Sequence, residues 1–96
     1  ICLKSISLYK MIREFETSKE EIVTILAEEC AELIQEIMKM KRKNDYASSP
    51  FMNEVADELL VIDLAKQAGL ISEEQLTIRT AFKRNKLKQW SNLFNL

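Results

Sequence analysis

Carboxylates dominate the residues of this sequence that could do chemistry. Two acidic pairs stand out because each repeats at helical spacing: Glu29 with Glu32, and Glu54 with Asp57. Residues three apart lie on one side of a helix, where like charges repel unless a counterion is present. No Lys or Arg lies between positions 21 and 36 to offset the first pair. Four converging carboxylates form an all-oxygen site, which suits Mg²⁺, with Mn²⁺ as a substitute, rather than zinc or copper.

The amino-acid composition argues against other kinds of active site. The 96 residues include no His and two Cys, Cys2 and Cys30. Zinc sites of the usual kind, His-based triads and di-iron bundles are therefore not expected. Cys30 lies among apolar residues at helical spacing, which predicts a buried free thiol.

The charge and hydropathy of the chain limit its partners. The net charge is −1, so no general attraction to a nucleic-acid polymer or to an anionic membrane is expected. The sequence has no signal peptide and no apolar run long enough to span a membrane. These features predict a reduced, cytoplasmic protein without a membrane partner.

The elements that must position the carboxylates are expected to be helices. A single Gly and a single Pro argue against a loop-rich or all-β protein. Capping residues and apolar periodicity predict four helices, which cover about residues 3–15, 18–42, 50–68 and 72–90.

Specific residues mark the ends of these helices. Ser18 and Glu21 form a capping box for the second helix. Ser49 is the expected N-cap of the third, which ends at Gly69. Ser72 and Gln75 form the capping box of the fourth.

The third helix is apolar on nearly every face, so its acids are not simply a solvated surface. Leu59 and Ile62 point away from the Glu54 stripe, and both faces need cover. The short linker before this helix makes the second and third helices antiparallel neighbours. We therefore expect one all-α domain over residues 1–96, of four-helix-bundle type, that assembles as a homodimer or homotetramer.

The acidic residues resemble the signature of the MazG-like all-α nucleotide pyrophosphohydrolases, which is EExxE, a variable gap, then ExxD. Here the signature reads EECAE at residues 28–32 and EVAD at residues 54–57. The segments LAEECAELIQEI and EVADELLVIDLAKQAGL are also similar to the central helices of that family. The resemblance covers roughly residues 22–88.

The resemblance implies a reaction and roles for these acids. The family cleaves nucleoside triphosphates between the α and β phosphates and gives a monophosphate and pyrophosphate. Glu29, Glu32, Glu54 and Asp57 match its principal Mg²⁺ ligands. Glu28 matches the first Glu of the motif, which resembles a second-metal ligand or a water-activating base in some members.

Phosphates also need cationic partners, and the fourth helix supplies them. Arg79, Lys83 and Lys86 lie near one stripe, as in the basic C-terminal helix of the family. Lys83 is the first candidate and Lys86 the second, and a solvated basic face is the alternative.

Residues that could recognise a base are less evident. The first helix offers Tyr9, Lys10, Arg13 and Phe15, which form no obvious base-reading set. Trp90 is expected to serve packing or an interface rather than stacking on a base. The sequence therefore does not indicate which base or which sugar the substrate carries.

Two other functions fit the same sequence. One is phosphoribosyl-ATP pyrophosphatase, which belongs to the same superfamily. The other is a non-catalytic helical dimerisation or interaction module, in which the acids form a solvated face.

Overall fold

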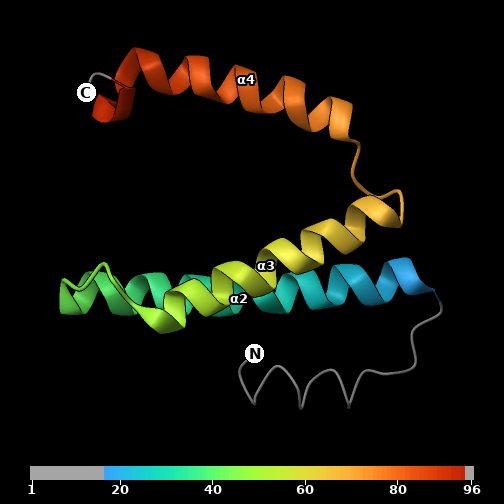
Figure 1. The fold of residues 1–96 in the computed structure, drawn as a ribbon, viewed down its shortest axis with the longest axis horizontal. Coiled ribbons are helices and arrows are strands. Elements are labelled where there is room, and N and C mark those ends of the chain that lie inside the picture. The colour runs from blue at the N-terminus through green and yellow to red at the C-terminus, as the bar shows by residue number, and fades with distance from the viewer. Residues whose placement is uncertain (1–16, 95–96) are drawn as a thin grey trace.

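The computed structural model describes residues 17–94, which form helices and no strand (Figure 1). The elements, in chain order, are α2 (Ser18–Lys43), α3 (Ser49–Gln67), α4 (Glu73–Trp90) and the short 3₁₀ helix η1 (Asn92–Phe94). The prediction of an all-helical fold is confirmed for this part of the chain. The expected first helix, with Tyr9, Lys10, Arg13 and Phe15, lies outside the described residues. None of the helices of residues 17–94 is long and apolar enough to cross a membrane.

Helix α2 is capped one residue earlier than expected. Thr17 is the N-cap, and its hydroxyl oxygen accepts a hydrogen bond from the backbone N–H of Glu20 at 3.1 Å. The prediction of Ser18 as the cap was wrong because Thr17 and Glu20 repeat the same capping-box spacing one residue upstream. At the other end, Asn44 adopts the left-handed conformation, with a φ of 51°, and ends the helix.

Helix α3 is also capped one residue earlier than expected. The hydroxyl of Ser48, not Ser49, accepts the backbone N–H of Phe51 at 3.2 Å. This placement suits Pro50, because the cap binds the N–H of the next residue and the missing proline N–H leaves no donor unsatisfied. The predicted end at Gly69 is confirmed, since its φ of +78° is in the left-handed region that favours glycine.

The start of α4 matches the prediction from sequence. The Ser72 hydroxyl accepts the backbone N–H of Gln75 at 3.3 Å. A salt bridge of 2.6 Å joins Lys66, near the end of α3, to Glu73 at the start of α4. This ion pair spans the turn that separates the two helices.

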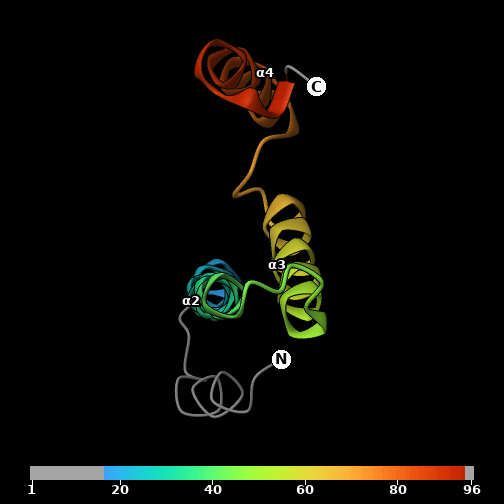
Figure 2. The same cartoon turned by 90° about the vertical axis from the view of Figure 1, so that its left-hand side faces the viewer.

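The helices form an antiparallel pair and a separate arm. Helices α2 and α3 pack side by side, whereas α4 stands away from them and packs mainly against η1 (Figures 1 and 2). The four-helix bundle is therefore not formed by the described residues of one chain and stays a prediction. The apolar third helix is not covered on all sides, since Leu59 is 61% exposed and Leu60 is 59% exposed.

Candidate metal centre

The acidic residues of the signature lie where α2 and α3 pack together. Glu29 and Glu32 come from the middle of α2, and Glu54 and Asp57 come from the first half of α3. The two helices run in opposite directions on either side of residues 44–48 (Figure 1). Antiparallel packing therefore brings the two acidic pairs to the same level of the helix pair.

Three of the four predicted ligands converge. One carboxylate oxygen from each of Glu29, Glu54 and Asp57 lies within 4.8 Å of the others. Glu29 is 1% exposed and Glu54 is 7% exposed, while Asp57 is half-buried. Ionised carboxylates this close and this buried repel one another unless a proton or a cation lies between them. The cluster is therefore a site for one or the other.

Glu54 shows how unfavourable the cluster is without a cation. Burial of its side chain is the largest cause of a raised pKa, which moves from 4.5 to about 7. The charge of Glu29, a hydrogen bond with Glu29, and the charges of Asp57 and Glu32 raise the pKa further. Each of these interactions favours the protonated form of Glu54. A bound divalent cation would replace that proton.

The oxygen atoms present fit a hard divalent cation. The Oε2 atom of Glu54 is buried and has no hydrogen-bond partner among residues 17–94. Mg²⁺ binds oxygen ligands at about 2.1 Å, so two ligands of one ion lie at most about 4.2 Å apart. Oxygens that already lie within 4.8 Å of one another need only small side-chain movements to reach this spacing.

The other two acids of the signature do not belong to this group of three. Glu32 is 6% exposed, and its charge contributes to the raised pKa of Glu54. However, the group of oxygens within 4.8 Å of one another does not include Glu32. Glu28 is half-buried on α2 and is also outside this group. The ligand role of Glu32 and the roles implied for Glu28 stay predictions.

The predicted phosphate-binding lysines lie apart from the carboxylates. Lys83 and Lys86 are exposed on α4, which stands away from the α2–α3 pair (Figure 1). Lys83 lines a pocket of about 380 Å³ together with Arg79, Arg84 and Phe94. Within one chain, the structure does not bring these lysines to the acidic cluster. Their contact with phosphates stays a prediction.

Cys30 differs from the expectation. Cys30 is exposed, so the prediction of a buried thiol was wrong. Its apolar neighbours form a helix face that no other helix of the described chain covers. Its thiol donates a hydrogen bond to Oε1 of Glu58 at 3.1 Å, and this bond is the main cause of a raised pKa for Cys30.

Glu58 was missed by the sequence reasoning. It is half-buried, and its Oε2 atom is buried without a hydrogen-bond partner in the described residues. Its position four residues after Glu54 could have revealed it, because this spacing places both acids on one side of α3. Glu58 therefore adds a fifth acidic side chain at the contact between α2 and α3.

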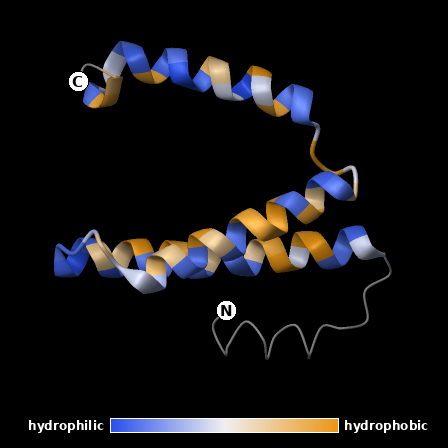
Figure 3. Cartoon of the chain, viewed as in Figure 1, coloured by the Kyte–Doolittle hydropathy of each residue, from blue (hydrophilic) through white to orange (hydrophobic). Residues whose placement is uncertain are grey.

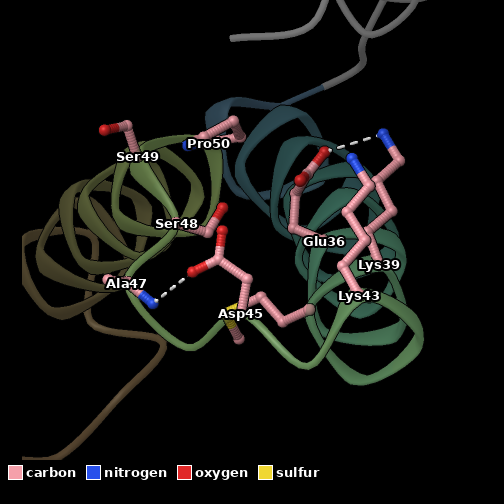
Figure 4. Close-up of a pocket in the computed structure, with 9 residues that line it drawn as sticks. Glu36, Lys39, Lys43, Asp45, Ala47, Ser48, Ser49 and Pro50 are labelled. Carbon is pink, nitrogen blue, oxygen red and sulfur yellow. Dashed lines mark hydrogen bonds and ion pairs between the residues drawn. The ribbon is translucent and has the colours of Figure 1, made fainter.

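A pocket at the turn between α2 and α3 is not a second candidate for the same chemistry (Figure 4). It has a volume of about 340 Å³, and its charged lining residues are Glu36, Lys39, Lys43 and Asp45. Lys39 forms a salt bridge with Glu36 at 3.0 Å. Two acids balance two bases, so the pocket has no net positive charge with which to hold a phosphate. Lys43 belongs to the basic last turn of α2, where its positive charge favours the helix dipole.

Three aromatic residues of α3, α4 and the turn before α3 are candidates for contact with a base or for packing. Tyr46 and Phe51 line a shallow pocket at the start of α3, and Trp90 is exposed at the end of α4. None of the three belongs to the acidic cluster, and the packing or interface role expected of Trp90 stays a prediction.

The site is therefore defined by its own geometry, which consists of buried carboxylates from two antiparallel helices. Its donor set is entirely oxygen, and its charge is unfavourable without a proton or a cation. No protein-family model, no curated protein and no solved structure matches this chain.

Proposed function

We propose that this chain is a Mg²⁺-dependent nucleoside triphosphate pyrophosphohydrolase. It would convert a nucleoside triphosphate and water to the monophosphate and pyrophosphate, in a cytoplasmic house-cleaning or pool-balancing role. The observation that carries this proposal is the convergence of Glu29, Glu54 and Asp57 within 4.8 Å at a buried helix contact. An acidic face with no function would be solvated, whereas these side chains are buried despite the cost.

The acidic side chains would serve as metal ligands and as a proton acceptor. Glu29, Glu54 and Asp57 would hold Mg²⁺, with Glu32 as the fourth ligand after a small movement. When bound, the ion supplies neutralisation of phosphate charge and a lower pKa for an attacking water. Glu28, which is half-buried and precedes Glu29 in the sequence, would accept the proton that this water loses.

The remaining charge of the triphosphate requires the basic residues of α4. Lys83 would contact the phosphates first and Lys86 second. Because α4 stands away from the carboxylates in one chain, this contact requires α4 to close on the cluster or a second copy to supply it.

A homodimer or homotetramer is part of the same proposal. The exposed leucines of α3, Leu59 and Leu60, are difficult to explain in a monomer. Packing of helix pairs from two copies would complete the four-helix bundle.

The reaction is tested with a panel of common ribo- and deoxyribonucleoside triphosphates and Mg²⁺, scored by release of pyrophosphate. We expect release from at least one nucleotide and its loss by at least about 100-fold in Glu29→Gln, because the ion is no longer held. Glu74→Gln, which alters an exposed Glu of α4, is the matched control and should keep full activity.

Inclusion of phosphoribosyl-ATP in the panel separates the two activities of the superfamily. Release from this substrate alone would replace the proposed substrate class. No release from any compound, with a folded protein, would leave the non-catalytic helical module as the function.

A further inference from the structure

An apolar stripe runs along the side of α2 that α3 leaves uncovered. Its members are spaced alternately four and three residues apart, and all are exposed or at the border of exposure: Val23, Ala27, Cys30, Ile34 and Ile37. This alternation keeps side chains on one helix face and is the spacing of helices that pack against each other along their length. Ile34, near the middle, is 60% exposed.

Helix α3 widens this apolar surface. The hydrogen bond from Cys30 to Glu58 shows that the stripe borders α3. On the helical wheel, Val55 and Ile62 lie within about 60° of Glu58 on the same flank of α3, and both are half-buried. Figure 3 shows hydrophobic residues gathered on α2 and α3, whereas hydrophilic residues prevail on α4. The surface is therefore larger than a single exposed side chain and needs a partner.

The charges at the two ends of α2 identify that partner as another copy of α2. The first turn carries two acids, Glu20 and Glu21, and the last turn carries three bases, Lys41, Arg42 and Lys43. In an antiparallel pair of identical helices, each acidic end lies beside the basic end of the other. The dipoles of the two helices also point in opposite directions in this arrangement, which is favourable. A two-fold axis generates it from identical chains.

We propose that two copies of this chain dock through the α2 stripe in antiparallel orientation, with the two-fold axis at Cys30. The stripe is nearly symmetric about this residue, since Val23 lies seven residues before it and Ile37 seven residues after it. Val23 therefore faces Ile37 of the partner subunit. The small side chains of Ala27 and Cys30 near the axis allow the two helices to approach closely.

This interface leaves the acidic cluster accessible. Glu28 and Glu32 lie on the side of α2 opposite the stripe, by the helical wheel. The inference rests on the homo-oligomeric part of the proposed function and not on its catalysis. Association is measured without nucleotide or metal, so its failure is distinct from a failure to release pyrophosphate.

The first experiment measures molar mass by sedimentation equilibrium. We expect the wild-type chain to be a dimer or a tetramer, and Ile34→Asp to halve its mass at equal concentration. Ile78→Asp is the matched control, because Ile78 is 65% exposed on α4 and receives the same substitution. Circular dichroism checks that both variants keep their helices. A monomeric wild type, an unchanged Ile34→Asp, or equal dissociation of both variants would overturn the proposal.

The second experiment tests the position of the axis by disulfide formation. The Cys2→Ser chain, which retains Cys30, is treated with diamide, an azo compound that takes up two protons and two electrons from a pair of thiols. We expect a covalent dimer, because a disulfide requires the two Cα atoms to lie within about 7 Å.

Control chains lack both native cysteines and carry one new one. Val23→Cys alone should not cross-link, because the two copies of this residue lie about 21 Å apart along the helix axis. A mixture of the Val23→Cys and Ile37→Cys chains should form the covalent dimer. Failure of Cys30 to cross-link in a chain that sediments as a dimer would overturn the proposed axis, and links from Val23→Cys alone would do the same.

Discussion

The carboxyl group of Glu54 on α3 is hydrogen-bonded to that of Glu29 on α2, across the contact of the two helices. Burial and the charge of Glu29 are the two largest causes that raise the pKa of Glu54 to about 7. A contact between two acids holds a proton at a pH where a free carboxyl has lost it. The packing of α2 on α3 is therefore coupled to protonation when no cation is present.

This coupling predicts how stability varies with pH. The unfolded chain releases the Glu54 proton near its ordinary pKa of 4.5, and the folded chain releases it near 7. The folded state thus binds more protons between these values, and its stability falls as the pH rises through this window. In EDTA, we expect the Tm at pH 8 to be roughly 10 °C lower than at pH 5, as for a loss of about 2 kcal/mol.

Glu54→Gln isolates this effect from other titrating groups. The amide cannot ionise, so the decrease in Tm between pH 5 and pH 8 should be smaller in the variant than in the wild type. An equal decrease in both proteins would show that Glu54 is not the residue that binds the proton.

Mg²⁺ should stabilise the protein, and more strongly at high pH. The ion competes with the proton for the carboxylates, so its effect on Tm should be larger at pH 8 than at pH 5.5. Asp57→Asn removes one ligand, and we expect it to abolish the increase in Tm at millimolar Mg²⁺.

Asp63→Asn is the matched control for this measurement. Asp63 is an exposed acid on the same helix, and its carboxylate accepts a hydrogen bond from Gln67 at 2.8 Å, away from the cluster. Its response to Mg²⁺ should equal that of the wild type. If Asp57→Asn keeps the full increase in Tm, the assignment of Asp57 as a ligand is wrong.

The start of α2 offers a test of the fold itself. Thr17→Ala removes the hydroxyl that accepts the N–H of Glu20, and we expect it to destabilise the protein by about 1 kcal/mol. Ser18→Ala should change the free energy of unfolding much less, because Ser18 is inside the first turn. Urea denaturation of both variants measures the difference, and a larger loss in Ser18→Ala would place the cap where the sequence pattern alone predicted it.

The helices and the acidic pairs were predictable because their signals are local. Glu29, Glu54 and Asp57 could be assigned to one site from helical spacing and a short linker. The caps at Thr17 and Ser48 were missed by one residue, since two adjacent residues at each end can act as a cap and side-chain geometry decides between them.

Other features depend on tertiary context that the pattern does not contain. Cys30 has the periodicity of a core residue, but it is exposed, because no helix of residues 17–94 covers the face that carries it. The position of α4 depends on the turn after Gly69 and on the ion pair of Lys66 with Glu73, and no periodicity encodes that direction. The basic residues of α4 could therefore be identified as a group without knowledge of which surface they approach.

Lys83 provides the last test, because its predicted role requires a contact that one chain does not make. Lys83→Ala should lower kcat/KM for pyrophosphate release by about 10-fold or more, since a cation that balances developing phosphate charge is lost. The increase in Tm with Mg²⁺ should be unchanged, because the lysine lies apart from the carboxylates. Lys88→Ala, an exposed lysine of the same helix, controls for a general loss of positive charge. Equal losses in both variants would indicate that α4 attracts the substrate by its overall charge and that Lys83 makes no specific contact.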